Sequence, residues 1–171
     1  MAYSLVSPLI GAQPIASFDT TQNHAWGTIV HAKDPTYGEG EFIYLKGVSG
    51  GFTGALVTYT NDGTTALSTT SGVATGGAPM AIMMSAMDAN TKYGWFQLSG
   101  NAVLYKTAVK FDPASGNRVY LSGTAGRIMQ TSVAGRQIIG ARFASTTTVT
   151  STTSTAIITI NRPSQKSGTA V

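Results

Sequence analysis

Short runs of apolar, aromatic and β-branched residues alternate with glycine-rich turns along most of the chain. In the run 40–48, for example, Phe42 and Tyr44 alternate with Ile43 and Leu45, as in a strand with two distinct faces. Runs of Leu, Glu and Lys at helical spacing are nearly absent, and the apolar runs recur at intervals of about eight to twelve residues. The pattern predicts an all-β fold, an antiparallel β-sandwich or barrel-like domain of about ten short strands.

Turn sequences separate the predicted strands. Residues 61–63 (Asn-Asp-Gly) and the pair Gly100-Asn101 tolerate positive φ, so each predicts a tight hairpin turn. Residues 112–117 also have the composition of a turn. In the segment 145–155, ten of eleven residues are Ser or Thr, which predicts a long hairpin loop, or alternatively a threonine-rich extension of the flanking strands. The predicted strands are 26–32, 40–48, 54–60, 64–69, 80–87, 93–99, 102–107, 118–121, 127–130, 138–144 and 156–160.

The first 23 residues combine apolar side chains with Pro8 and Pro14, which interrupt a helix or a strand interior. We therefore expect an extended N-terminal arm over residues 1–23, a β domain over 24–163 and a disordered tail over 164–171. The arm either lies in a groove of a neighbouring subunit or folds back onto its own domain. Its candidate contact residues are Tyr3, Leu5, Val6, Leu9, Ile10 and Ile15.

Charge is scarce and unevenly placed. Charged residues make up 11% of the 171 residues, against about 25% in a typical soluble domain, which favours a protein that is packed against neighbours. All seven acidic residues and five lysines lie within residues 1–112, giving −2, whereas residues 113–171 carry five arginines, one lysine and no acidic residue, giving +6. The net charge is +4.

A basic half raises the question of nucleic-acid binding. Its arginines are widely spaced, stand near predicted strand ends beside glycines, and are not interleaved with aromatic residues, so we expect exposed turns or ion pairs between subunits instead of direct nucleic-acid contact. No apolar stretch is long enough to span a membrane, and the N-terminus lacks the pattern of a signal peptide. The candidate inter-subunit residues are Arg118, Arg127, Arg136 and Arg142.

The residues that usually carry catalysis or metals form no recognisable constellation. The chain has no cysteine, and its two histidines, His24 and His31, are seven residues apart, which places them on opposite faces of a strand. Glu39 and Glu41 suit a solvated strand start better than a cation site. The glycine-rich stretches match neither a phosphate-binding loop nor a dinucleotide-binding turn. We expect no enzymatic activity, no metal and no cofactor.

Residues 93–163 contain a series of short motifs. A Tyr-Gly-Trp strand (93–95) leads to Gly100 and Ala102. A turn Ala-Gly-Arg (125–127) is followed by Gly135, Ile138, Gly140 and Ala141, and the last strand ends in Arg162 and Pro163. In this order and spacing the series, which covers about seventy of the 171 residues, resembles the head decoration (capsid cement) proteins of tailed bacteriophages. The Ser/Thr segment 145–155 departs from that family, in which a shorter glycine-bearing turn is expected.

The resemblance implies a virion protein that is made in the host cytoplasm and binds the exterior of the expanded capsid. Its implied partners are the major capsid protein and further copies of itself, commonly in a trimer, and its implied role is to stabilise the head against internal pressure. The alternative is a receptor-binding or glycan-binding β module of a phage fibre or tail. In that interpretation, exposed aromatic residues stack on sugar rings, and the candidates are Trp26, Tyr37, Tyr44 and Tyr59.

Overall fold

A computed structural model describes residues 4–5, 13–70 and 77–166. The all-β prediction is confirmed: the described residues form one sheet of twelve strands, which curls into a half-barrel, and they contain no α-helix. The strands are β1 (Ser4–Leu5), β2 (Phe18–Asp19), β3 (Ile29–Asp34), β4 (Gly38–Lys46), β5 (Leu56–Tyr59), β6 (Thr65–Leu67), β7 (Met80–Met83), β8 (Tyr93–Tyr105), β9 (Arg118–Leu121), β10 (Ile128–Met129), β11 (Gln137–Arg142) and β12 (Thr155–Gln165), with a 3-10 turn, η2, at Pro113–Ser115.

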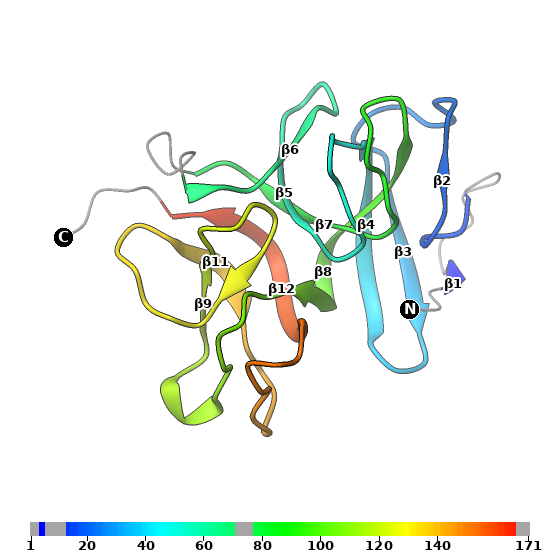
Figure 1. The fold of residues 1–171 in the computed structure, drawn as a ribbon. Coiled ribbons are helices and arrows are strands. Elements are labelled where there is room, and N and C mark those ends of the chain that lie inside the picture. Colours follow the sequence, from blue (N-terminus) through cyan, green and yellow to red (C-terminus); the bar gives the residue numbers. More distant parts are fainter. Residues whose placement is uncertain (1–3, 6–12, 71–76, 167–171) are drawn as a thin grey trace.

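The long strand β8 joins the two ends of the sheet. Its first half pairs with β4, where Ile43 stands opposite Phe96, and its second half pairs with β12, where Ile157 stands opposite Val103. The main strand order is β1-β3-β4-β8-β12-β11-β9-β10, and β7, β5 and β6 branch from β8. Figure 1 shows β3 and β4 on one side of β8, and β9 and β11 on the other side beyond β12.

The predicted hairpin at Gly100-Asn101 is wrong. Residues 93–105 form one continuous strand of 13 residues, in which Gly100 has a φ of +97°. A Cβ atom on Gly100 would lie 2.4 Å from the carbonyl oxygen of Glu39. The glycine therefore serves the close approach of β4 to β8, and the chain does not turn there because β12 pairs along both sides of this point.

The last strand is longer than predicted, since β12 continues through Gln165 and takes in the start of the predicted tail. It lies between β8 and β11, and its pairing with β11 contains a bulge, where the register shifts between Ile139 and Ala141. Gly140 and Arg162 both have positive φ here, at 76° and 43°. A Cβ atom on Gly140 would lie 2.4 Å from the carbonyl oxygen of Asn161. Two of the sequence motifs therefore meet at one β-bulge that bends the sheet.

Among the described residues, three hydrophobic clusters pack against the sheet, and they lie on both of its faces. Phe42 and Tyr44 of β4 pack in one cluster with Trp95, whereas Ile43 and Leu45 on the other face of β4 belong to a second. Both faces of β4 are therefore buried, as its alternating aromatic and aliphatic residues allow. A third cluster is built mainly from the strands β7 to β12, and its members include Met80, Leu104, Phe111, Ile138, Phe143, Ile158 and Ile160.

The predicted boundary at residue 23 does not separate an arm from the domain. Ile15 is only 1% exposed and packs in the cluster that contains Trp95. The indole Nε1 of Trp95 donates a hydrogen bond to the carbonyl oxygen of Gln13 at 3.1 Å, and β2 pairs with β8 through Phe18 opposite Gly94. The described residues 13–19 thus fold back onto their own domain, because this is where Ile15 leaves water.

Several local predictions are confirmed. The turn at 112–117 contains η2, where the carboxylate of Asp112 accepts a hydrogen bond from the N–H of Ala114. The segment 145–155 joins β11 to β12 as a long loop, anchored where Val149 pairs with Phe111.

The strand predicted over 80–87 is confirmed only in its first half, because β7 ends at Met83.

The hairpin turn predicted at residues 61–63 is confirmed, and it gives a pH-dependent prediction. Asp62 accepts hydrogen bonds from the hydroxyls of Thr60 and Thr64 and from the Thr64 N–H, and these bonds lower the pKa of Asp62 from 3.8 to about 2. Because the folded-state pKa is the lower one, the contribution to stability is present above 3.8 and is lost as the pH falls towards 2. Urea unfolding should show that Asp62→Asn destabilises the protein at pH 7, and that the difference shrinks at low pH. An equal difference at both pH values would contradict this role.

Candidate interaction surface

The strand β12 has one buried and one exposed face. Its inward side chains Ala156, Ile158 and Ile160 are at most 3% exposed, whereas Ile157 is 47% exposed. Thr159 and Asn161 also point outward, and across the ladder with β8 the exposed side chains oppose Val103 and Asn101. We call this surface, formed by Asn101, Val103, Ile157, Thr159 and Asn161, the outer face.

The outer face carries no charged side chain, and a side-chain hydrogen bond links its two strands. The Thr159 hydroxyl donates a hydrogen bond to Asn101 Oδ1 at 2.8 Å, which links β12 to β8. At its border, Arg162 and Glu41 form an ion pair at 2.5 Å. Next to Ile157 the surface sinks into a depression of about 370 Å³, which Tyr37, Val103, Val149 and several threonines line. An uncharged sheet surface with an exposed isoleucine and a depression has the character of a protein-binding surface.

The structure brings two of the four candidate arginines together. Arg118 of β9 and Arg142 of β11 stand directly opposite each other in the antiparallel ladder, and both are exposed. They line a groove of about 450 Å³ between the two strands, together with Asn117, Gln137 and Ile139. We call this hollow the β9–β11 groove.

The other two candidate arginines are placed differently. The guanidinium of Arg127 lies over the rings of Phe52, at 5.9 Å, and Tyr105, at 5.6 Å. It therefore contributes to packing within the chain as a cation–π partner. Arg136 lies in the turn before β11, where its N–H donates to the carbonyl of Val133 and its carbonyl accepts from the N–H of Leu121.

The predicted arm contacts are only partly described. Tyr3, Val6, Leu9 and Ile10 lie outside the described residues, and Leu5 is described only as the backbone partner of Ala32 in β1. Ile15 is buried in the domain core, so its place among the candidate contacts is corrected: a buried side chain of the folded domain does not meet a neighbouring subunit.

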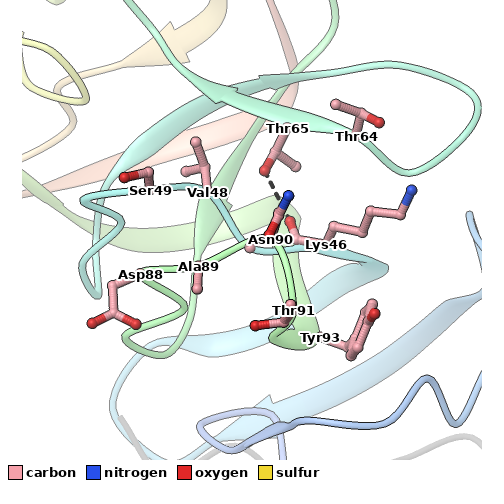
Figure 2. A pocket seen from close by; sticks show the side chains of 11 residues that line it. Lys46, Val48, Ser49, Thr64, Thr65, Asp88, Ala89, Asn90, Thr91 and Tyr93 are labelled. Carbon is pink, nitrogen blue, oxygen red and sulfur yellow. Dashed lines mark hydrogen bonds between the residues drawn. The ribbon is translucent and has the colours of Figure 1, made fainter.

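A polar hollow of about 740 Å³ opens near Tyr93, at the start of β8 (Figure 2). Lys46, Asn90 and Tyr93 line it together with Thr64, Thr65 and residues 88–91. The hydroxyl of Thr65 donates to the carbonyl of Lys46 at 2.8 Å, and the acidic residue at its border, Asp88, pairs with Lys92 at 2.7 Å.

The aromatic residues proposed to stack on sugar rings are mostly covered. Tyr44 is fully buried and packs edge-on against Trp95 at 5.2 Å. A sugar ring therefore has no access to it. Burial raises the pKa of the Tyr44 hydroxyl, which accepts a hydrogen bond from the N–H of Asn23. Trp26 is half-buried, with the Lys46 ammonium 4.9 Å from its ring. Tyr37 and Tyr59 are also half-buried.

The burial of one lysine was not predicted. Lys106 is 1% exposed, and its ammonium donates hydrogen bonds to the carbonyls of Val109, at 2.8 Å, and Thr107, at 3.3 Å. Burial lowers the pKa of this ammonium. The sequence around it shows an ordinary alternating strand, so no signal marks the lysine as buried. Its contacts tie the end of β8 to the following loop.

Among the described residues, no three His, Cys, Asp or Glu side chains gather where they would hold a metal ion. Within the same part of the chain, no helix has the length and apolar character needed to cross a membrane. Comparison of the chain with protein-family models, curated proteins and solved structures gives no match.

Proposed function

We propose that this protein is a phage head decoration protein, which binds the outer surface of the expanded capsid as a homo-oligomer and stabilises it. The observation that carries the proposal is the uncharged outer face with its exposed Ile157, which is 47% exposed, on a chain with only 11% charged residues. A surface of this kind is suited to permanent burial against protein neighbours.

The motifs behind the family resemblance support the same proposal through their structural roles. Trp95 is a central core residue, and Gly140, Arg162 and Pro163 lie at the bulge in the pairing of β11 with β12. Before this bulge, strand alternation places Ile157 and Thr159 of β12 on the outer face. The motif residues therefore hold the core and the strand pairing that support the proposed binding surface.

The mechanism is a thermodynamic clamp. A protein that binds only the expanded lattice stabilises that lattice by mass action, without any chemical step. Linked copies that engage neighbouring capsid subunits add avidity, so each single contact needs only moderate strength. We propose a trimer as the state that delivers this avidity.

The direct test uses purified protein and matched empty heads in unexpanded and expanded forms. We expect co-sedimentation with expanded heads only, and a higher temperature of head disruption when the protein is bound. Failure to bind either form would overturn the proposal. It would leave the glycan-binding alternative, for which the polar hollow lined by Tyr93 and Asn90 is the site to test on a glycan array.

The variant Ile157→Thr tests the outer face. Threonine keeps the β-branched shape but removes apolar area, so binding to expanded heads should weaken about fivefold or more, because about 1 kcal/mol is lost at each copy. The matched control is Ile29→Thr, since Ile29 is 41% exposed but lies on β3. Both variants should keep the circular dichroism spectrum of the parent protein. Equal binding by the two variants would exclude the outer face as the contact.

A further inference from the structure

The ladder between β9 and β11 is interrupted in an unusual way. Gln137 pairs with Tyr120 and Arg142 pairs with Arg118, so five residue steps on β11 run beside two on β9. The intervening residues divide between two directions: Ile138 is buried at 1% and Ile139 is 46% exposed, while Gly140 is held against the backbone of β12. The β9–β11 groove is therefore a built feature of the fold, fixed on its far side by β12.

At the end of this interruption two positively charged residues, Arg118 and Arg142, stand opposite each other. Side chains of directly opposed residues in an antiparallel ladder have Cβ atoms about 4.5–5.5 Å apart, and like charges at such positions are destabilising. The ion pairs found among the described residues join Lys92 to Asp88, Lys110 to Asp112 and Arg162 to Glu41. None includes Arg118 or Arg142, and the sequence holds no Asp or Glu beyond Asp112.

We infer that the β9–β11 groove binds a carboxylate-bearing segment of a partner protein, with Arg118 and Arg142 as the anion-binding residues. An Asp or Glu side chain between the two guanidinium groups converts a repulsive pair into charge-assisted hydrogen bonds. Asn117 and Gln137 line the groove with further amide groups, and Ile139 supplies apolar surface for the neighbouring residues of the segment. This inference deepens the proposed function. It rests on that function only for the identity of the partner, which is the capsid surface.

The groove fits a peptide better than a nucleic acid. Nucleic-acid binding requires a row of cations that follows successive phosphates, usually with aromatic platforms for the bases. Here the lining has two arginines and no aromatic residue, and Arg127 does not extend this row because it packs on Phe52 and Tyr105. A short segment with one or two carboxylates and apolar neighbours matches this lining.

The test is an NMR titration of the full chain with the capped peptide Glu-Val-Glu-Val-Glu in low-salt buffer. We expect saturable shifts confined to β9 and β11, and none with the matched peptide Gln-Val-Gln-Val-Gln. Arg118→Gln and Arg142→Gln should each weaken binding about tenfold, as loss of a charge-assisted hydrogen bond predicts. Arg142→Lys keeps the charge but loses the planar fork, so it should show an intermediate loss. The control Lys33→Gln, which removes one charge from the exposed β3 residue, should bind like the parent.

Thermal unfolding provides a second measurement, in which the arginine variants should gain stability although they lose affinity for the peptide. Removing one of the two opposed charges should raise the melting temperature of the free protein by about 1 to 4 °C, while it weakens peptide binding. A variant that merely fails to fold would show the reverse change in melting temperature.

Three results would overturn the inference. The first is equal binding of the Glu and Gln peptides, and the second is unchanged affinity for the Glu peptide in both arginine variants. The third is binding of a twelve-base-pair DNA duplex that is tighter than binding of the Glu peptide and depends on the same arginines. Failure here with intact binding to expanded heads would leave the proposed function standing. Peptide binding without head binding would instead overturn the proposed function and keep the groove.

Discussion

Replacing Trp95 by alanine should lower the free energy of unfolding by about 3–5 kcal/mol, the usual cost of removing a buried aromatic side chain. Trp95 is fully buried, and its ring packs against Tyr44 at 5.2 Å and His24 at 5.4 Å. Its Nε1 also holds the carbonyl of Gln13, so the variant should release the segment that contains Ile15. Urea unfolding measures the loss, and amide hydrogen exchange at residues 13–19 reports the release.

The variant Trp95→Phe separates packing from hydrogen bonding. Phenylalanine keeps most of the ring contacts but leaves the carbonyl of Gln13 without its donor, so a smaller loss of about 1–3 kcal/mol is expected. A loss below about 1 kcal/mol for Trp95→Ala would contradict the central role of this cluster, because it would mean that the site collapses without leaving a cavity.

The second large effect is expected for Gly100→Ala, which should destabilise the protein by about 2–5 kcal/mol. Two costs combine at this position. The backbone has a φ of +97°, which disfavours any side chain, and the new Cβ atom would meet the carbonyl oxygen of Glu39 at 2.4 Å and the Cα of Gly40 at 3.2 Å. Both contacts are to backbone, so β4 and β8 must separate to admit the methyl group.

Variants of two further glycines separate the cost of backbone strain from the cost of the steric contact. Gly38 has a φ of +79°, but a methyl group added there would meet open space, so Gly38→Ala should cost about 1 kcal/mol from backbone strain alone. Gly123 has neither positive φ nor neighbours within 4 Å of an added methyl group, so Gly123→Ala should be close to neutral. Urea unfolding of the three variants should rank them in this order. A Gly100→Ala variant as stable as Gly38→Ala would exclude the close approach of the two strands as a cause.

The sequence by itself determined the fold class and most of the element positions. The alternation in residues 40–48 correctly separated Phe42 and Tyr44 from Ile43 and Leu45, because side-chain direction in a strand follows position alone. The turns at 61–63 and 112–117 were likewise predictable, since Asp and Gly favour the required backbone locally.

Other features depended on partners far away in the chain. Gly100-Asn101 has the composition of a hairpin turn, yet the strand continues because β4 and β12 supply its hydrogen-bonding neighbours. From the sequence, residues 13–19 look like part of an extended arm. They are held to the domain by Trp95, which lies 82 residues beyond Gln13 and donates a hydrogen bond to its carbonyl. Local composition carries no record of such contacts.

The candidate binding surface was also only partly predictable. The four arginines were found from the one-sided charge distribution, but the register of β9 against β11 alone decided that Arg118 and Arg142 stand opposite each other, while Arg127 packs on Phe52 and Tyr105. Strand alternation placed Ile157 and Ile158 on different faces, but which face lies over the core is set by the curl of the whole sheet. Sequence patterns fix local direction, and tertiary pairing decides which residues become neighbours.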